Sequence, residues 1–262
     1  MWLFQPKKLK KKRIQLIVSI ITVLSFCWIL FSYISSLTGE EGHQFSYSDA
    51  IQIEVPQKHL IHGIDVSHHN GIVPWNHLSE LEIFDTVSLK FVFIKATEGR
   101  SLQDPNFQVN WHKAKQKGLI AGAYHFYIPT RDPIEQAKNF CNMVKLQEGD
   151  LPPVCDIEVT NRVSHQKIRK DIKAFLDYLT EHYHTKPILY TNTRMYADLF
   201  NNEEFTDFPL WLASYESNTI VDADNLRFWQ YSKQGKLQGN SKSWDYNVFL
   251  GDHSEFASML IK

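Results

Sequence analysis

Eight short apolar runs occupy the sequence from residue 60 onward and constrain its fold more than any other feature. They are LIHGIDVS (60–67), KFVFIKATEG (90–99), LIAGAYHFY (119–127), PPVCDIEV (152–159), KPILYTN (186–192), LWLASY (210–215), LRFWQYS (226–232) and WDYNVF (244–249). Most are continuously apolar rather than alternating, which is typical of strands buried on both faces of a parallel sheet. The runs therefore predict a parallel sheet covered by helices.

Helical patterns lie between the earlier runs. Asp104-Pro105 and Asp132-Pro133 each have the form of a helix start, with an N-cap Asp and Pro at the first helical position. A third helix is expected from Ser164 to about Tyr183, where apolar residues recur along one face. Strands that alternate with helices in this way indicate a β/α barrel.

The last third of the barrel is expected to be shortened. Only ten residues separate Tyr215 from Leu226, which is too few for a full crossover helix. A short final connection is compatible with an antiparallel last strand. We therefore predict an irregular, TIM-like (β/α)-barrel over residues 60–262.

The N-terminal residues have the composition of a membrane anchor. Residues 1–13 carry six cations and no acid, and the uncharged run IQLIVSIITVLSFCWILFSYISSL (14–37) exceeds the roughly 20 residues that span a bilayer. Cations before the run predict a cytoplasmic basic segment (1–13), a transmembrane signal anchor (14–37) and an extracytoplasmic remainder at the cell membrane. A cleaved signal peptide is the alternative, but its apolar core is usually shorter and ends in a small-x-small site. Residues 38–59 lack strong periodicity and are expected to be a linker.

Composition excludes some functions and leaves others open. Without residues 1–13, the chain has 28 − 6 = 22 basic against 29 acidic side chains, which argues against nucleic-acid binding. The three cysteines have no zinc spacing, and Cys141 and Cys155 form either a disulfide or two buried thiols. The adjacent His68 and His69 point apart on an extended chain, which disfavours a metal site. No metal or other cofactor is expected.

Polar residues recur near the ends of the predicted strands, where β/α barrels carry their chemistry. They are Asp65, Glu98, Tyr127, Asp156, Glu158 and Asn192, with Asp245 at the same rim if the last strand is antiparallel. Taken alone, Asp65 is explained equally well as a turn cap. His125 is expected to be structural or to contact a sugar. Four tryptophans are either core residues or flat surfaces for sugar rings: Trp75, Trp211, Trp229 and Trp244.

Asp156 and Glu158 form the most informative pair. Two positions apart on a strand, their side chains point to the same face, and the preceding Pro-Val-Cys suggests an interior backbone. Two such carboxylates repel one another and lose hydration, so at least one pKa should rise. The resulting acid can protonate a departing glycosidic oxygen. The alternative is a pair neutralised by lysine or arginine.

The ordered set of segments resembles glycoside hydrolase family 25, the muramidases. The matching pieces are HGIDVSHHNG (62–71), FVFIKATEG (91–99), DPNFQVNWHKAKQKGLIAGAYHFY (104–127), LPPVCDIEV (151–159), ILYTN (188–192), LWLASY (210–215), FWQYS (228–232) and WDYNVFLGD (244–252). Each piece is unspecific, but their order is specific and covers the body after the predicted linker. Pro74-Trp75 and Trp244-Asp245-Tyr246 depart from the family's usual residues without removing a carboxylate.

The resemblance implies a lysozyme that cleaves the β-1,4 bond between N-acetylmuramic acid and N-acetylglucosamine in peptidoglycan strands. It implies Glu158 as catalytic acid, Asp156 as the acid that stabilises the charged intermediate or orients the acetamido group, and Asp65 and Asp245 as further carboxylates of the site. Expected substrate contacts are Tyr127, Glu98, Trp211, Gln230 and Tyr215.

Three rival functions share some of these sequence features. A chitinase-like barrel would extend the pair to D-x-x-D-x-D-x-E, but Leu151 and Val154 occupy the earlier acidic positions. A silent wall-binding module would not need the full carboxylate set. A glycosidase for another acetamido polysaccharide, such as chitin, remains open at this point.

Overall fold

The computed structural model describes residues 21–22, 24–26, 28–30, 44–84, 87–215, 220–237 and 242–262. The chain divides into two compact units, residues 1–42 and 43–262. The predicted cytoplasmic segment and most of the predicted anchor lie outside the described residues. Those described between 21 and 30 are helical, and no helix among the described parts of the chain is long and apolar enough to cross a membrane.

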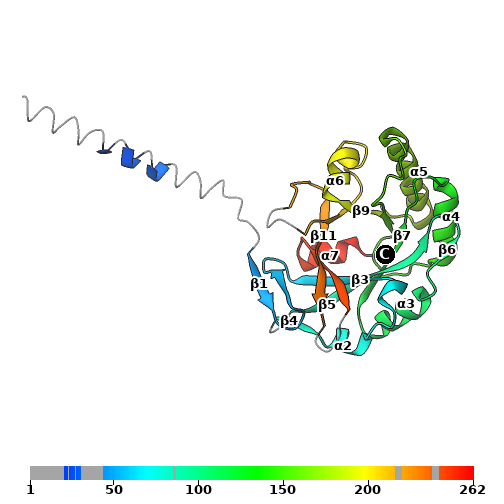
Figure 1. Ribbon diagram of the computed structural model, residues 1–262, viewed down its shortest axis with the longest axis horizontal. Coiled ribbons are helices and arrows are strands. Elements are labelled where there is room, and N and C mark those ends of the chain that lie inside the picture. The colour runs from blue at the N-terminus through cyan, green and yellow to red at the C-terminus, as the bar shows by residue number, and fades with distance from the viewer. Residues whose placement is uncertain are drawn as a thin grey trace, which may run out of the picture. The chain divides into compact units, whose positions relative to one another are not determined.

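A closed barrel of eight strands forms the second unit (Figure 1). The strands are β3 (Ile61–Val66), β5 (Val87–Glu98), β7 (Ile120–Phe126), β8 (Val154–Asp156), β9 (Ile188–Asn192), β10 (Leu210–Ala213), β11 (Leu226–Lys236) and β12 (Ser243–Phe249). Each lies in, or largely overlaps, one of the eight predicted runs. Neighbouring strands from β3 to β11 pair in parallel, and β12 closes the barrel antiparallel to both β11 and β3. The irregular barrel and the antiparallel last strand are thus confirmed.

Helices cover the first two thirds of the barrel. They include α3 (Phe107–Gln116), α4 (Pro133–Met143) and α5 (His165–Tyr183), which lie outside the strands in Figure 1. Shorter elements complete the unit: the 3₁₀ turn η1 (His68–Asn70), α2 (Trp75–Ser79), β4 (Glu82–Phe84), β6 (Leu102–Gln103), α6 (Thr193–Met195), the π-helical turn η2 (Tyr196–Phe200) and α7 (His253–Met259). No helix separates β10, β11 and β12 among the described residues, as the short spacings predicted.

Two of the three predicted helix starts are confirmed and one is wrong. Asp132 caps α4 by accepting from the backbone N–H groups of Ile134 and Glu135, and Ser164 caps α5. The cap predicted at Asp104 is wrong, because α3 begins only at Phe107. Asp104 is instead buried and binds the loop after β3, as described below.

Aromatic side chains fill the barrel interior at the amino-terminal ends of the parallel strands. Phe256 of α7 packs against Phe91, Phe228 and Phe249, with ring centroids 5.1–6.4 Å apart. Gly63 permits this filling, since a Cβ there would lie 2.5 Å from the Phe91 ring. Aromatic packing therefore fills the barrel interior at this end.

Residues 38–59 are not simply a linker, which corrects the prediction. They contain a β-hairpin of β1 (Phe45–Ser48) and β2 (Ile53–Pro56), whose Ile51 and Val55 are fully buried. The Lys236 N–H donates to the Ile51 carbonyl (2.7 Å), so the hairpin is attached to β11. The hairpin was not predicted because four-residue strands with one buried face give too short a pattern of apolar residues to detect.

The hairpin should contribute to the stability of the barrel unit. Ser48 Oγ is buried and donates to the carbonyl of Ile83 at 2.7 Å. Ser48→Ala should therefore lower the free energy of unfolding by about 1–3 kcal/mol, since it leaves that carbonyl without its donor. Urea unfolding measures this, with Ser46→Ala in the same strand as the matched control. Equal stability of the two variants would contradict the attachment.

Cys141 and Cys155 are both buried free thiols, which decides between the two alternatives that the sequence left open.

Candidate active site

A cavity of about 180 Å³ opens at the carboxyl ends of the parallel strands. Its walls come from every barrel strand except β5, or from the residues that directly follow a strand. The lining residues are Asp65, Tyr124, Asp156, Glu158, Tyr190, Trp211, Tyr215, Gln230 and Asp245. The four predicted carboxylates are therefore brought together, with three of the five predicted substrate contacts: Trp211, Tyr215 and Gln230.

Asp156 and Glu158 reach the cavity differently from the prediction. The strand was expected to include both, but β8 ends at Asp156. The Ile157 N–H still donates to the Tyr190 carbonyl (3.0 Å), so the backbone stays extended and Ile157 is buried in the outer layer. Asp156 is buried, whereas Glu158 is exposed at the mouth.

Tyr127 does not line the cavity, so its predicted substrate contact is a correction. Its side chain is fully buried, and its ring lies edge-on to Phe175 of α5 at 5.5 Å. The tyrosines that line the cavity are Tyr124, Tyr190 and Tyr215. The alternation of side chains along a strand carried this signal, because residues three apart point to opposite faces.

Glu98 also lies outside the cavity lining, contrary to prediction. Its carboxylate pairs at 2.6 Å with Nζ of Lys95, which is only 5% exposed. The Lys95 ammonium also lies 4.9 Å from the centre of the Phe126 ring. Sequence reasoning missed Lys95, although a lysine inside the apolar run FVFIKATEG was a visible signal.

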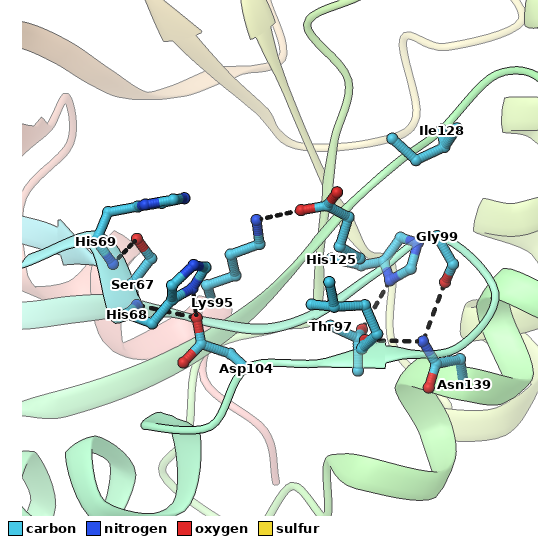
Figure 2. Close-up of polar contacts among 12 residues, drawn as sticks. Ser67, His68, His69, Lys95, Thr97, Gly99, Asp104, His125, Ile128 and Asn139 are labelled. Atoms are coloured by element: carbon cyan, nitrogen blue, oxygen red, sulfur yellow. Dashed lines mark hydrogen bonds and ion pairs between the residues drawn. The ribbon is translucent and has the colours of Figure 1, made fainter.

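A second polar cluster fixes the loop after β3. Oδ2 of Asp104 accepts from both the backbone N–H of His68 (2.9 Å) and its Nδ1 (2.7 Å), as Figure 2 shows. The ring of His69 lies 3.9 Å from that of His68. Within the described residues no group of three or more histidine, cysteine or acidic side chains is placed to hold a metal ion.

His125 is structural rather than sugar-contacting. It is fully buried and hydrogen-bonds through Nδ1 to Thr97 Oγ1 at 2.7 Å (Figure 2). Burial lowers the pKa of His125 to about 3, so the ring is neutral. Of the four tryptophans considered above, Trp75, Trp229 and Trp244 lie in the outer core and only Trp211 lines the cavity.

A hydrogen-bond network holds Asp65 on the cavity wall. Its Oδ2 accepts from Gln230 Nε2 (2.7 Å) and from Asn247 Nδ2 (2.8 Å). The Gln230 carbonyl accepts from the hydroxyls of Tyr190 (2.8 Å) and Tyr215.

The other amide is fixed in the same way, because the carbonyl of Asn247 accepts from the Trp211 indole N–H at 2.9 Å. Both amides are thus oriented with their NH₂ groups toward Asp65, which favours its ionised form locally. Asn247 and Tyr190 were missed by sequence reasoning, although both are polar residues inside predicted strands.

Burial governs the charge state of the four carboxylates. It is the main cause that raises the pKa of Asp65, Asp156 and Glu158, and it raises the pKa of Asp245 to about 6. The charge of Glu158 raises the pKa of Asp156 further. Because the pKa values of both interacting carboxyl groups are raised, the pair favours retention of a proton.

The alternative of a neutralised pair is not what the structure shows. Among the described residues none of the four carboxylates forms an ion pair within 4.0 Å of a cation, in contrast to Glu98. An acidic cavity with a retained proton can protonate an oxygen and then stabilise the positive charge that develops beside it.

Comparisons with known proteins agree with this chemistry. The family model of glycosyl hydrolases family 25 matches residues 64–240. An autolytic lysozyme of Clostridium acetobutylicum is 34% identical over 188 residues, covering 71% of this chain and 55% of that protein.

Two solved structures of family 25 enzymes are also similar to this chain. A family 25 glycosyl hydrolase from Bacillus anthracis superposes with a TM-score of 0.69 at 28% identity, covering 84% of this chain and 98% of that one. A family GH25 lysozyme from Aspergillus fumigatus gives a TM-score of 0.67 at 27% identity, covering 77% and 99% of the two chains.

Proposed function

Because this chain belongs to glycosyl hydrolase family 25, we propose that it hydrolyses the β-1,4 bond between N-acetylmuramic acid and N-acetylglucosamine in peptidoglycan. The observation that carries the proposal is the set of four carboxylates around one cavity at the carboxyl ends of the barrel strands, none of them paired with a cation among the described residues. Sugar binding is supported by Trp211, Tyr124 and Tyr215 in the same walls, whose rings and hydroxyls suit a polar ring substrate.

Glu158 is the group that delivers the proton in this proposal. It is the more exposed member of the pair with Asp156, so its carboxyl can reach a glycosidic oxygen. Its raised pKa keeps it protonated closer to neutral pH than an ordinary glutamate. Loss of the leaving group gives an oxocarbenium-like state at the sugar.

Asp156, Asp65 and Asp245 stabilise that positive charge. Once Glu158 has given up its proton, the negative charges of the cavity face the cation at short range. Asp65 is the most rigidly held of the three, since two amides bind one of its oxygens. Asp156 is also placed beside Glu158 to orient an acetamido group of the substrate.

Mass spectrometry of the fragments released from purified peptidoglycan by the full-length protein tests the proposal. Muropeptides with muramic acid at the new reducing end are the expected result. Sedimentation with the wall and no released fragments would point instead to a wall-binding module. Equal or faster digestion of chitin in a parallel assay would favour another acetamido polysaccharide as the substrate.

We also propose that residues 14–37 anchor the protein in the cell membrane, with residues 1–13 in the cytoplasm and the barrel outside. The six cations before an uncharged run support this topology. Carbonate extraction of membranes should leave the full-length chain in the pellet and release a chain that begins at residue 44. A mature protein that lacks residues 1–37 would show a cleaved signal peptide instead.

A further inference from the structure

One lysine, Lys233, contacts a residue of the cavity wall. It lies on the exposed part of β11, where the register with β12 shifts, three residues after the cavity residue Gln230. Its ammonium group lies 4.9 Å from the centre of the Tyr215 ring, and Tyr215 lines the cavity. This cation–π contact holds a positive charge at the rim of an acidic cavity.

Within the described residues, Lys233 has no carboxylate within ion-pair distance. Other lysines do, for example Lys95 with Glu98 and Lys115 with Asp150. The charge of Lys233 nevertheless reaches the cavity, because it lowers the pKa values of Glu158 and Asp245. Lys233 is therefore a positioned cation whose own hydrogen-bond donors remain available at the cavity mouth.

We propose that Lys233 binds a carboxylate carried by the muramic acid unit of the substrate, either that of its lactyl ether or one of the peptide attached to it. The inference rests on the proposed function. A substrate bearing such anions meets four carboxylates in the cavity, which repel it. A cation held at the mouth offsets that repulsion and selects strands that carry carboxylates over neutral polysaccharides.

The same geometry admits a different role, in which Lys233 acts only on the carboxylates of the protein. The two roles differ in their dependence on the substrate. A contact with substrate requires a carboxylate on the glycan, whereas an effect on Glu158 or Asp245 does not. Substrates that differ only in their carboxylates separate them.

Three soluble strand preparations supply this difference. Intact uncross-linked strands carry the peptide carboxylates. Strands stripped by an amidase carry only the lactyl carboxylate. Strands whose carboxyl groups have been coupled to methylamine carry none. Affinity is measured by calorimetry with the full-length protein in detergent, in a Glu158→Gln background so that hydrolysis does not consume the ligand.

Lys233→Met should weaken binding of the carboxylate-bearing strands by about two- to fivefold, the size expected of an exposed ion pair. The loss should shrink at high salt, because an exposed pair is screened. Lys236→Met is the matched control, since Lys236 is an exposed lysine of the same strand and is not part of the cavity lining. Lys233→Arg should keep most of the affinity.

The pattern of affinity losses across the three preparations identifies the carboxylate that Lys233 contacts. A loss with intact strands alone assigns the contact to the peptide, and a loss with stripped strands alone assigns it to the lactyl group. A loss with both preparations shows that Lys233 binds either carboxylate. An equal loss with methylamidated strands, or no loss with any strand, overturns the proposal. The failure of the proposed function is separate: the unmutated protein would then release no fragments from any strand, whatever the affinities.

Discussion

Glu158→Gln should lower kcat on peptidoglycan by at least about 10²-fold, because the variant has no proton to give to the leaving oxygen. Glutamine preserves the size of the side chain, so the cavity walls should remain in place. KM should change little, since the lost interaction belongs to the transition state. The release of reducing ends from soluble strands at several pH values measures both constants.

The controls for this variant address charge and folding. Glu148→Gln removes an exposed glutamate outside the cavity and should leave kcat unchanged. Thermal unfolding should show that Glu158→Gln is at least as stable as the unmodified protein, since it removes a carboxylate whose pKa burial has raised. A kcat within about tenfold of the unmodified protein would show that Glu158 is not the acid. Asp156, the other member of the pair, would then be the residue to replace.

Much of the fold was accessible from the sequence because barrel strands are buried on both faces. Continuous apolar runs of strand length mark such strands without any alternation, and all eight runs became strands. The short spacing between the last runs also indicated that an antiparallel strand closes the barrel. The hairpin Phe45–Pro56 was missed because its stability comes from contacts with β11 and β4. Such tertiary contacts leave no periodic trace in a short segment.

The candidate site was predictable to the extent that strand ends define it. The end of each strand placed Asp65, Asp156 and Asp245 at one rim. What the prediction did not use was the alternation of side chains along the strand, which places Tyr124 and Tyr127 on opposite faces. Tyr127 follows β7 directly, yet it turns outward to Phe175, while Tyr124 within the strand points inward.

The hydrogen-bond network around Asp65 was also not predictable from the sequence. Asn247 and Gln230 converge on Asp65 from two different strands, β12 and β11. Only the register of those strands with β3 brings the three groups together. The charge of Lys233 depends in the same way on tertiary structure, since its contact is with the Tyr215 ring from another part of the chain.

The concentration of carboxylates should cost the protein stability at neutral pH, and Asp245 provides the test. Burial raises its pKa from 3.8 to about 6 in the folded protein. Between these values the unfolded chain ionises while the folded chain keeps its proton, so stability falls as the pH rises from about 4 to about 6. Above that range the penalty is constant, at up to about 3 kcal/mol for two pKa units.

Asp245→Asn should remove this penalty and keep the shape of the side chain. We expect the variant to exceed the unmodified protein in free energy of unfolding by roughly 1–3 kcal/mol at pH 8, and by almost nothing below pH 4. Urea unfolding across this pH range measures the difference. Asp222→Asn, at an exposed position outside the cavity, is the matched control and should show no such pH-dependent gain.

The same variant should lose activity, because Asp245 is one of the charges proposed to stabilise the sugar cation. A protein that gains stability and loses hydrolysis on replacement of one carboxylate has kept that carboxylate for its function. If Asp245→Asn were instead less stable than the unmodified protein at pH 8, the ionised form of Asp245 would be favoured by the fold. The cavity would then be a satisfied structural cluster, and the catalytic interpretation of its acidity would lose its physical basis.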